Sequence, residues 1–80
     1  MHYIYLLVST VVPTKIYIGS TTDLERRLRE HNHAKSPYSQ RYAPWQLRTF
    51  VAFSDQTHAR AFEKYLKSGS GFAFMKKRLL

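Results

Sequence analysis

Two tyrosines, an arginine, a histidine and one glutamate are the side chains of this chain that could together cut a phosphodiester bond. They are Tyr5, Tyr17, Arg27, His31 and Glu63. A guanidinium presents a planar set of donors to phosphate oxygens and offsets the negative charge that grows on them during phosphoryl transfer. A carboxylate suits magnesium, which keeps several waters beside one or two such ligands. These residue types therefore offer water activation, charge neutralisation and metal binding.

Glu63 lies four residues after Ala59, next to Phe62 and three before Leu66, so its carboxylate is beside the face expected to be buried, loses hydration and needs a compensating partner. A divalent cation is one such partner. An ion pair with Lys67, four residues later, is an ordinary alternative, and a buried pair with Arg27 is another. Taken alone, the helix leaves the choice between metal ligand and structural ion pair open.

The tyrosines and the histidine also have ordinary roles. Tyr5 and Tyr17 can be packing residues, because tyrosine is common in strands and an unperturbed phenol, with a pKa of about 10, is a poor base. A phenol accepts a proton only if a metal or an arginine stabilises its phenolate. His31 can relay a proton, contact a phosphate or interact with the dipole at a helix C-terminus.

Two short apolar runs near the start predict the strands that carry the tyrosines. Residues Tyr3–Val8 form an aromatic and branched run, and Lys15–Gly19 alternates between two faces. A short loop containing Pro13 joins them, so an antiparallel hairpin is expected. If Tyr5 pairs opposite Tyr17, both side chains lie on one face of the sheet.

The first helix is expected from about Asp23 to Asn32. Thr22 and Glu25 have the spacing of a capping box, in which each side chain satisfies an amide of the other's backbone. Arg27 and His31 are four residues apart and would lie side by side on this helix. The next segment, residues 33–44, contains two prolines and is predicted to be irregular.

The second half of the chain predicts a third strand and two helices. Trp45–Phe53 is the strand, and Ser54 or Asp55 can cap a helix that runs to about Lys67. The buried face of that helix is expected to hold Ala59, Phe62 and Leu66. Glycines within residues 68–71 are expected to end it with a left-handed cap. Residues 72–80 then form a short amphipathic helix with Phe74, Met75 and Leu79 inward.

Composition points to a small basic protein that binds a polyanion. The 80 residues are expected to form one domain, 1–80, and the net charge of +8 makes nucleic acid the first candidate partner. There is no cysteine, which fits a reducing compartment, and no signal-peptide pattern or apolar run long enough for a membrane span. A cytoplasmic protein without membrane contact is therefore expected.

Several motifs occur in an order that resembles the GIY-YIG endonuclease family. The signature tripeptides correspond to Tyr3-Ile4-Tyr5 and Tyr17-Ile18-Gly19, and the stretch from Tyr17 to Asn32 is similar to the family's central segment. Pro44-Trp45 and Phe62-Glu63-Lys64 also fit. The likeness covers nearly the whole chain and is closest to small single-domain members akin to the nuclease module of bacterial excision-repair proteins.

The resemblance implies an α+β fold: a three-stranded antiparallel sheet flanked by helices, in the order β-β-α-β-α plus a short C-terminal helix. It also implies metal-dependent hydrolysis of DNA with little sequence specificity. Tyr5 and Tyr17 would help to activate water, with Tyr17 favoured as proton acceptor, while Arg27 stabilises charge and His31 assists. Glu63 would bind one Mg²⁺, for which Mn²⁺ is a plausible substitute.

The expected partner is DNA, either single-stranded, branched or damaged, and a monomer is adequate for nicking one strand. Five residues are expected to contact the nucleic acid: Gly19, Arg26, Lys35, Tyr38 and Arg41.

Two positions depart from the family's pattern. Tyr3 stands where the first signature has glycine, and no asparagine follows Asn32, although many members use one after the glutamate helix. The role of that asparagine is then either absent or filled by a residue such as Ser68 or Ser70. The alternative function is therefore a nucleic-acid-binding module with weak or no cleavage, or an RNA-directed or partner-dependent nuclease.

Overall fold

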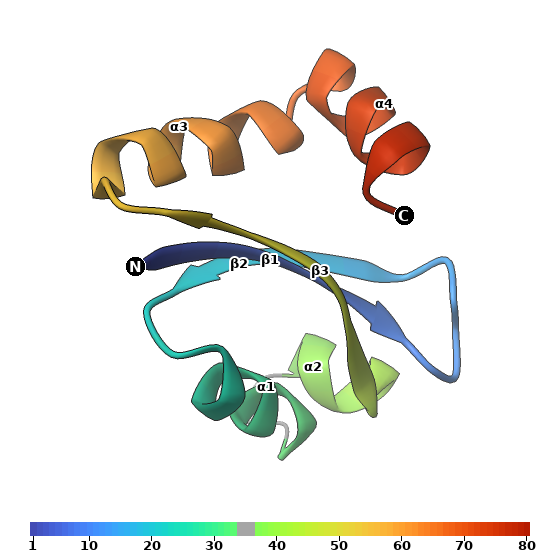
Figure 1. Ribbon diagram of the computed structural model, residues 1–80. Helices are drawn as coiled ribbons and strands as arrows, with labels where there is room; N and C mark the ends of the chain where they lie inside the picture. The colour runs from blue at the N-terminus through green and yellow to red at the C-terminus, as the bar shows by residue number, and fades with distance from the viewer. Residues whose placement is uncertain (34–36) are drawn as a thin grey trace.

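A three-stranded antiparallel sheet lies between two layers of helices in the computed structural model, which describes residues 1–33 and 37–80 (Figure 1). Side chains are described for all of these residues except 37–39. The elements are β1 (His2–Ser9), β2 (Ile16–Thr21), α1 (Leu24–Asn32), α2 (Pro37–Tyr42), β3 (Trp45–Phe53), α3 (Gln56–Leu66) and α4 (Gly69–Arg78). The predicted α+β class, sheet and element order are confirmed, with α2 as an additional helix.

The strand order β2-β1-β3 places β1 at the centre of the sheet. Four successive residues of β1, Ile4 to Leu7, are buried, because the two helical layers cover both faces of this strand. Side chains alternate along a strand, so Ile4 and Leu6 face α3 and α4, whereas Tyr5 and Leu7 face α1 and α2. The apolar run that predicted a buried strand is explained by this double burial.

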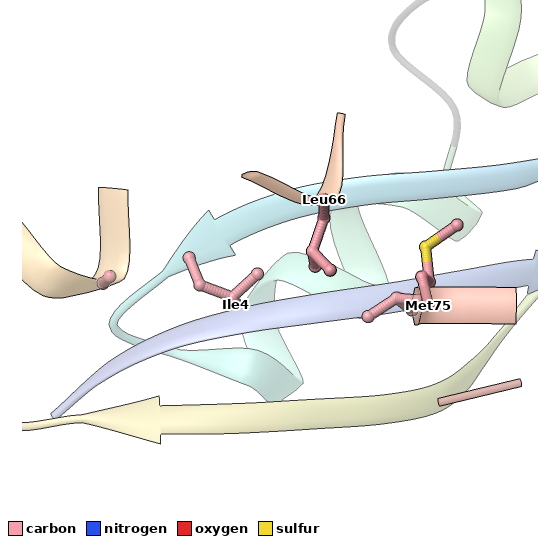
Figure 2. Close-up of a cluster of buried hydrophobic side chains, with 5 residues drawn as sticks. Ile4, Leu66 and Met75 are labelled. Atoms are coloured by element: carbon pink, nitrogen blue, oxygen red, sulfur yellow. The ribbon is translucent and has the colours of Figure 1, made fainter. Parts of the chain in front are cut away.

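An aliphatic core fills the space between the sheet and the helices α3 and α4. Figure 2 shows Ile4 of β1, Leu66 of α3 and Met75 of α4 gathered in this cluster. All three side chains are fully buried, and burial of each stabilises the fold by about 1.5–3 kcal/mol. This layer therefore supplies much of the stability that holds α3 in place.

The opposite core is aromatic. Tyr5, Leu7 and Trp45 are buried there, and Leu24 and Leu28 of α1 pack against them. The hydroxyl of a buried phenol needs a hydrogen-bond partner, whereas a buried aliphatic side chain needs none. The sequence thus places a polar group inside this layer, and α1 has to supply its partners.

The hairpin register differs from the one predicted. Tyr5 pairs with Gly19, and Tyr17 pairs with Leu7, so the two tyrosines are diagonal neighbours rather than directly opposite. The expected pairing of Tyr5 with Tyr17 is therefore wrong. The difference is two residues along one strand, which leaves both side chains on the same face.

The capping prediction for α1 is also displaced by one residue. The N-cap is Asp23, whose Oδ1 accepts the amide of Arg26 at 3.1 Å, and Thr21 in turn accepts the amide of Asp23. Thr22 was expected in this role, and no capping box forms with Glu25. For α3 the predicted cap Asp55 is confirmed, since its carboxylate accepts the amide of Thr57.

Two further predictions about helices are wrong. Residues 37–42 of the segment expected to be irregular form α2, which begins at Pro37, where a missing amide costs nothing. The glycines after α3 do not act as left-handed caps, because no glycine in the described residues has a positive φ. Gly69 and Gly71 instead lie within α4, which Ser68 caps. Phe74, expected inward, is exposed.

Within residues 1–33 and 37–80, no helix has the length and apolar character needed to cross a bilayer.

Candidate active site

The hydroxyl of Tyr5 is the centre of a hydrogen-bonded group between the sheet and α1. Tyr5 is 2% exposed, and its oxygen lies 3.3 Å from Nε of Arg27 and 3.0 Å from Nε2 of His31. A guanidinium nitrogen can only donate, so the tyrosine oxygen accepts from Arg27. The second hydrogen bond joins the Tyr5 hydroxyl to Nε2 of His31, and the tautomer of the imidazole decides which of the two donates.

The buried surroundings of His31 favour its neutral form. The side chain is buried, and burial together with the charge of Arg27 lowers the pKa of His31 from its ordinary value, although Glu30 opposes this shift. The ring is therefore neutral at pH 7. Burial also raises the pKa of Tyr5, while the hydrogen bond and charge of Arg27 act to lower it. A protonated phenol and a neutral imidazole therefore share this hydrogen bond.

Gly19 allows the Tyr5 ring to reach this position. A Cβ atom on Gly19 would lie 2.5 Å from Cζ of Tyr5 and 3.0 Å from Cε1 of Tyr17. Both distances are far below ordinary van der Waals contact. The glycine of the second signature thus seats the two rings, and this explains its type without a contact to nucleic acid.

Tyr17 lies beside Tyr5 but nearer to solvent. The two rings stack with centroids 6.3 Å apart, and the Tyr17 ring is 4.4 Å from the ring of His31. Tyr17 is half-buried, in contrast to the fully buried Tyr5. Of the two phenols, Tyr17 is therefore the one that an incoming molecule can approach.

Arg27 reaches from the Tyr5 hydroxyl towards the surface. Its side chain is 44% exposed, and its Nη1 is 3.5 Å from Oε1 of Glu30. The hydrogen bond with Tyr5 raises the pKa of Arg27. The guanidinium is thus held at Nε by Tyr5, while its outer edge can meet a phosphate.

Glu63 comes from α3, in the helical layer on the other face of the sheet (Figure 1). Its carboxylate is 3.1 Å from Nζ of Lys67, which is the ordinary pairing that the spacing allowed; the side chain is 23% exposed. Among the effects that raise the pKa of Tyr5, burial is the largest and the charge of Glu63 is the smallest.

A single half-buried carboxylate fits magnesium better than it fits zinc. Among residues 1–33 and 37–80, no three His, Cys, Asp or Glu side chains lie close enough together to hold a metal ion. Zinc needs several protein ligands, whereas magnesium accepts one or two carboxylates and completes its shell with water and phosphate oxygens. The carboxylate of Glu63, which the resemblance pointed to, has the chemistry for that part.

The residues expected to contact nucleic acid have different surroundings. Arg26 is exposed, and its Nε lies 3.9 Å from Oε1 of Glu30. The guanidinium carbon of Arg41 lies over the ring of Tyr42, 5.7 Å from the ring centroid. Lys35 lies outside the described residues. Tyr38 lies in α2, and its side chain is not among those described.

Two supporting residues of this site were not predicted. Glu30 pairs with Arg27 three residues earlier, a spacing that was visible in the sequence. Asn32 joins the end of α1 to the start of β3, since its amide group donates to the carbonyl of Trp45 and accepts the Trp45 amide. Nothing in the sequence pairs these two residues, because the link depends on how the strands are ordered.

Comparisons with known proteins relate this chain to one family and to several named proteins. A family model described as the GIY-YIG catalytic domain matches residues 1–78. A UPF0213 protein of Haloquadratum walsbyi is 37% identical over 68 residues, which cover 84% of this chain and 74% of that protein. A structure-specific endonuclease subunit of Talaromyces marneffei, slx1, is 40% identical over 65 residues, 74% of this chain and 17% of its own length.

A second such subunit, from Ajellomyces capsulatus, is 38% identical over 65 residues, 74% of this chain and 15% of that protein. The chain thus spans about a sixth of the length of these two fungal subunits.

Proposed function

This chain belongs to the GIY-YIG catalytic domain family, and from that premise we propose that it is a metal-dependent endonuclease that hydrolyses DNA with little sequence preference. The observation that carries the proposal is the shared environment of Tyr5: its hydroxyl is bonded to Arg27 and His31, and its ring stacks on Tyr17. Groups from β1, β2 and α1 thus meet around one phenol, while Glu63 comes from α3 on the other face of the sheet.

Tyr17 is the residue we assign to accept a proton from the attacking water. The hydroxyl of Tyr5 is buried and already engaged by two partners, so it positions Arg27 and His31 rather than meeting solvent. Tyr17 lies against both rings with its surface partly exposed. Proton acceptance by a positioned side chain contributes about 10²–10⁴-fold to a rate.

Arg27 and His31 serve the charge that develops on the phosphate. Arg27 is fixed at Nε and exposed at its outer nitrogens, so it can stabilise non-bridging oxygens at small cost in reorganisation. Its pair with Glu30 is half-exposed and weak, and a phosphate can displace it. His31 holds the orientation of Tyr5 through its hydrogen bond, as a neutral ring.

Glu63 would hold the divalent metal, with water and substrate oxygens as its other ligands. When bound, Mg²⁺ or Mn²⁺ supplies polarisation of the phosphoryl oxygen and stabilisation of the leaving group. To bind the metal, the carboxylate of Glu63 has to leave its ion pair with Lys67. An i,i+4 pair of this kind contributes only about 0.3–0.5 kcal/mol to stability.

The nucleic acid is held mainly through its backbone in this proposal. Arg26, Lys35 and Arg41 supply charge, and Tyr38 supplies a ring for unpaired bases. One site acts on one strand, so a monomer nicks. The two fungal relatives are named structure-specific endonuclease subunits, which makes branched DNA the first substrate to examine.

A binding module without cleavage is the second candidate. No asparagine follows Asn32, and the hydroxyl of Ser68 already accepts the amide of Gly71 and donates to the carbonyl of Tyr65. Ser68 is therefore not free to replace the asparagine. The fungal relatives are named subunits, which also motivates an enzyme that requires a partner or is directed by RNA.

A nicking assay on supercoiled and branched DNA tests the proposal. We expect cleavage with Mg²⁺ and none with chelator, and we expect Glu63→Gln to lose at least about 100-fold in rate while binding DNA as before. Glu25→Gln is the matched control, because Glu25 is an exposed glutamate in the first turn of α1.

If the wild-type protein binds all of these substrates but cleaves none of them, the binding module is the better description of its function. Equal cleavage by wild type and Glu63→Gln would remove Glu63 from the site.

A further inference from the structure

A polar cavity lies at the end of the sheet where β2 finishes and α3 begins, and none of the catalytic side chains lines it. Its volume is about 120 Å³, several times the space that one water requires. The polar side chains around it belong to His2, Ser20, Thr22, Gln56 and Arg60.

The lining offers hydrogen-bond donors and positive charge without any carboxylate. No ion pair or side-chain hydrogen bond engages Arg60 within residues 1–33 and 37–80. Two acidic residues precede the nearby helices, but Asp55 accepts the amide of Thr57 and lies 2.9 Å from His58, while Asp23 accepts the amide of Arg26. An arginine fork beside hydroxyl and amide groups suits a phosphate.

Two segments connect this cavity directly to the candidate active site. Ser20 follows Gly19, the residue that seats the rings of Tyr5 and Tyr17. Arg60 precedes Glu63 by three residues on α3, so the two backbone positions are separated by about 4.5 Å along the helix axis. One nucleotide of a strand advances by about 3.4 Å along a duplex, so this rise spans one to two nucleotides.

We propose that this cavity is a second phosphate subsite, which binds a phosphodiester of the same DNA strand one or two nucleotides from the phosphate being cleaved. The assignment rests on the proposed function, because the strand has to pass Glu63 to reach Arg60. Arg60 is a binding residue here, and the hydroxyls of Ser20 and Thr22 and the amide of Gln56 complete the contacts.

Fluorescence anisotropy with a labelled single-stranded oligonucleotide tests the subsite without metal and hence without cleavage. Arg60→Gln should weaken binding about fivefold and reduce the slope of log Kd against log salt by about 0.7, the value for one phosphate contact. Arg78→Gln is the control for lost charge, because Arg78 is exposed on α4, at the opposite end of the sheet (Figure 1). An unchanged slope for Arg60→Gln, or an equal loss for Arg78→Gln, would overturn the proposal.

A comparison of KM values for a long and a short substrate distinguishes failure of the subsite from failure of the proposed function. Arg60→Gln should raise KM for an oligonucleotide several-fold more than for the p-nitrophenyl ester of thymidine 5′-phosphate, which carries a single phosphodiester. An equal loss on both substrates would contradict the subsite. If wild type cleaves neither substrate, the proposed function fails, while the salt slope still decides whether the cavity binds phosphate.

Discussion

The Tyr5 hydroxyl joins residues that are far apart in the sequence. It accepts a hydrogen bond from Arg27 on α1 and shares a second one with His31, one turn later on the same helix. Both partners can reach the same hydroxyl because they are four residues apart on α1, and residues with this spacing share one side of a helix. The phenol of Tyr5 is buried where it makes these hydrogen bonds. The neighbouring Tyr17 is more exposed, so it is the phenol that water can reach.

Gly19→Ala is expected to disrupt the group around Tyr5. The new Cβ would lie 2.5 Å from Cζ of Tyr5, so the ring has to shift away from its partners. Overpacking of this kind costs about 1–3 kcal/mol, which urea denaturation will measure. Gly69→Ala is the matched control: no atom lies within 4 Å of its new Cβ, and alanine is favoured in a helix by about 1 kcal/mol. Equal effects at both positions would contradict the close packing described for Gly19.

His31 is expected to make the stability of the protein depend on pH. Its pKa in the folded protein lies below the ordinary 6.5, mainly because burial disfavours the charged ring. The unfolded chain then binds more protons, so stability rises with pH. The contribution is complete above about pH 6.5 and is lost as the pH falls through that value towards the lowered pKa.

Urea denaturation between pH 5 and 8 checks this dependence. His31→Gln should remove the part of the slope that His31 contributes, whereas His33→Gln, at an exposed position beyond α1, should retain it. Identical slopes for wild type and His31→Gln would show that the ring is not held neutral by burial.

At the scale of elements, the junction between α3 and α4 fixes the helical layer that carries Glu63. Ser68 caps α4, and its hydroxyl also donates to the carbonyl of Tyr65 at 2.6 Å, so one side chain serves the end of one helix and the start of the next. Gly71 lies against the backbone of Tyr65, where a Cβ would have no room. The glycine-rich segment thus permits a tight turn between two packed helices.

Ser68→Ala is expected to lower stability by about 1 kcal/mol, the usual cost of a lost N-cap, and the denaturation midpoint will show it. Ser70→Ala provides the comparison, because Ser70 is exposed within α4 and alanine suits a helix. If both serines could be replaced without loss, the capping role of Ser68 would be wrong.

The sequence predicted strands better than connections. Trp45–Phe53 has the predicted bounds, because aromatic and branched residues alternate along it. The prolines of residues 33–44 predict an irregular segment, yet α2 begins at Pro37, because proline is favoured at the first helical position. The Tyr5–Gly19 pairing was missed because a hairpin's register depends on the conformation of its loop, which the residues from Ser9 to Thr14 do not specify.

The types of the candidate site residues were predictable, but their contacts were not. Spacing placed Arg27 beside His31, and the resemblance named Glu63. The hydrogen bonds that Arg27 and His31 make to Tyr5 depend on how α1 crosses the sheet, and no local pattern encodes that crossing. The link between Asn32 and Trp45 was missed for the same reason.

At the scale of the whole molecule, the sheet separates two layers with different chemistry (Figure 1). The layer with α3 and α4 has an aliphatic core and presents Glu63, while the layer with α1 and α2 has an aromatic core and presents Arg27 and Tyr17. A net charge of +8 on 80 residues favours a polyanion as the ligand. A strand of DNA that contacts both layers would meet the carboxylate, the phenol and the guanidinium together.

The cleavage rate of Tyr17→Phe under single-turnover conditions, with Kd for the same DNA measured alongside, tests this account most directly. We predict that the rate falls by about 100-fold or more, because water loses its proton acceptor, while Kd changes by less than about threefold, because the ring remains in place. A Tyr17→Phe protein that cleaves as fast as wild type, or that loses binding in proportion to cleavage, would contradict the convergence of these groups on one phosphate.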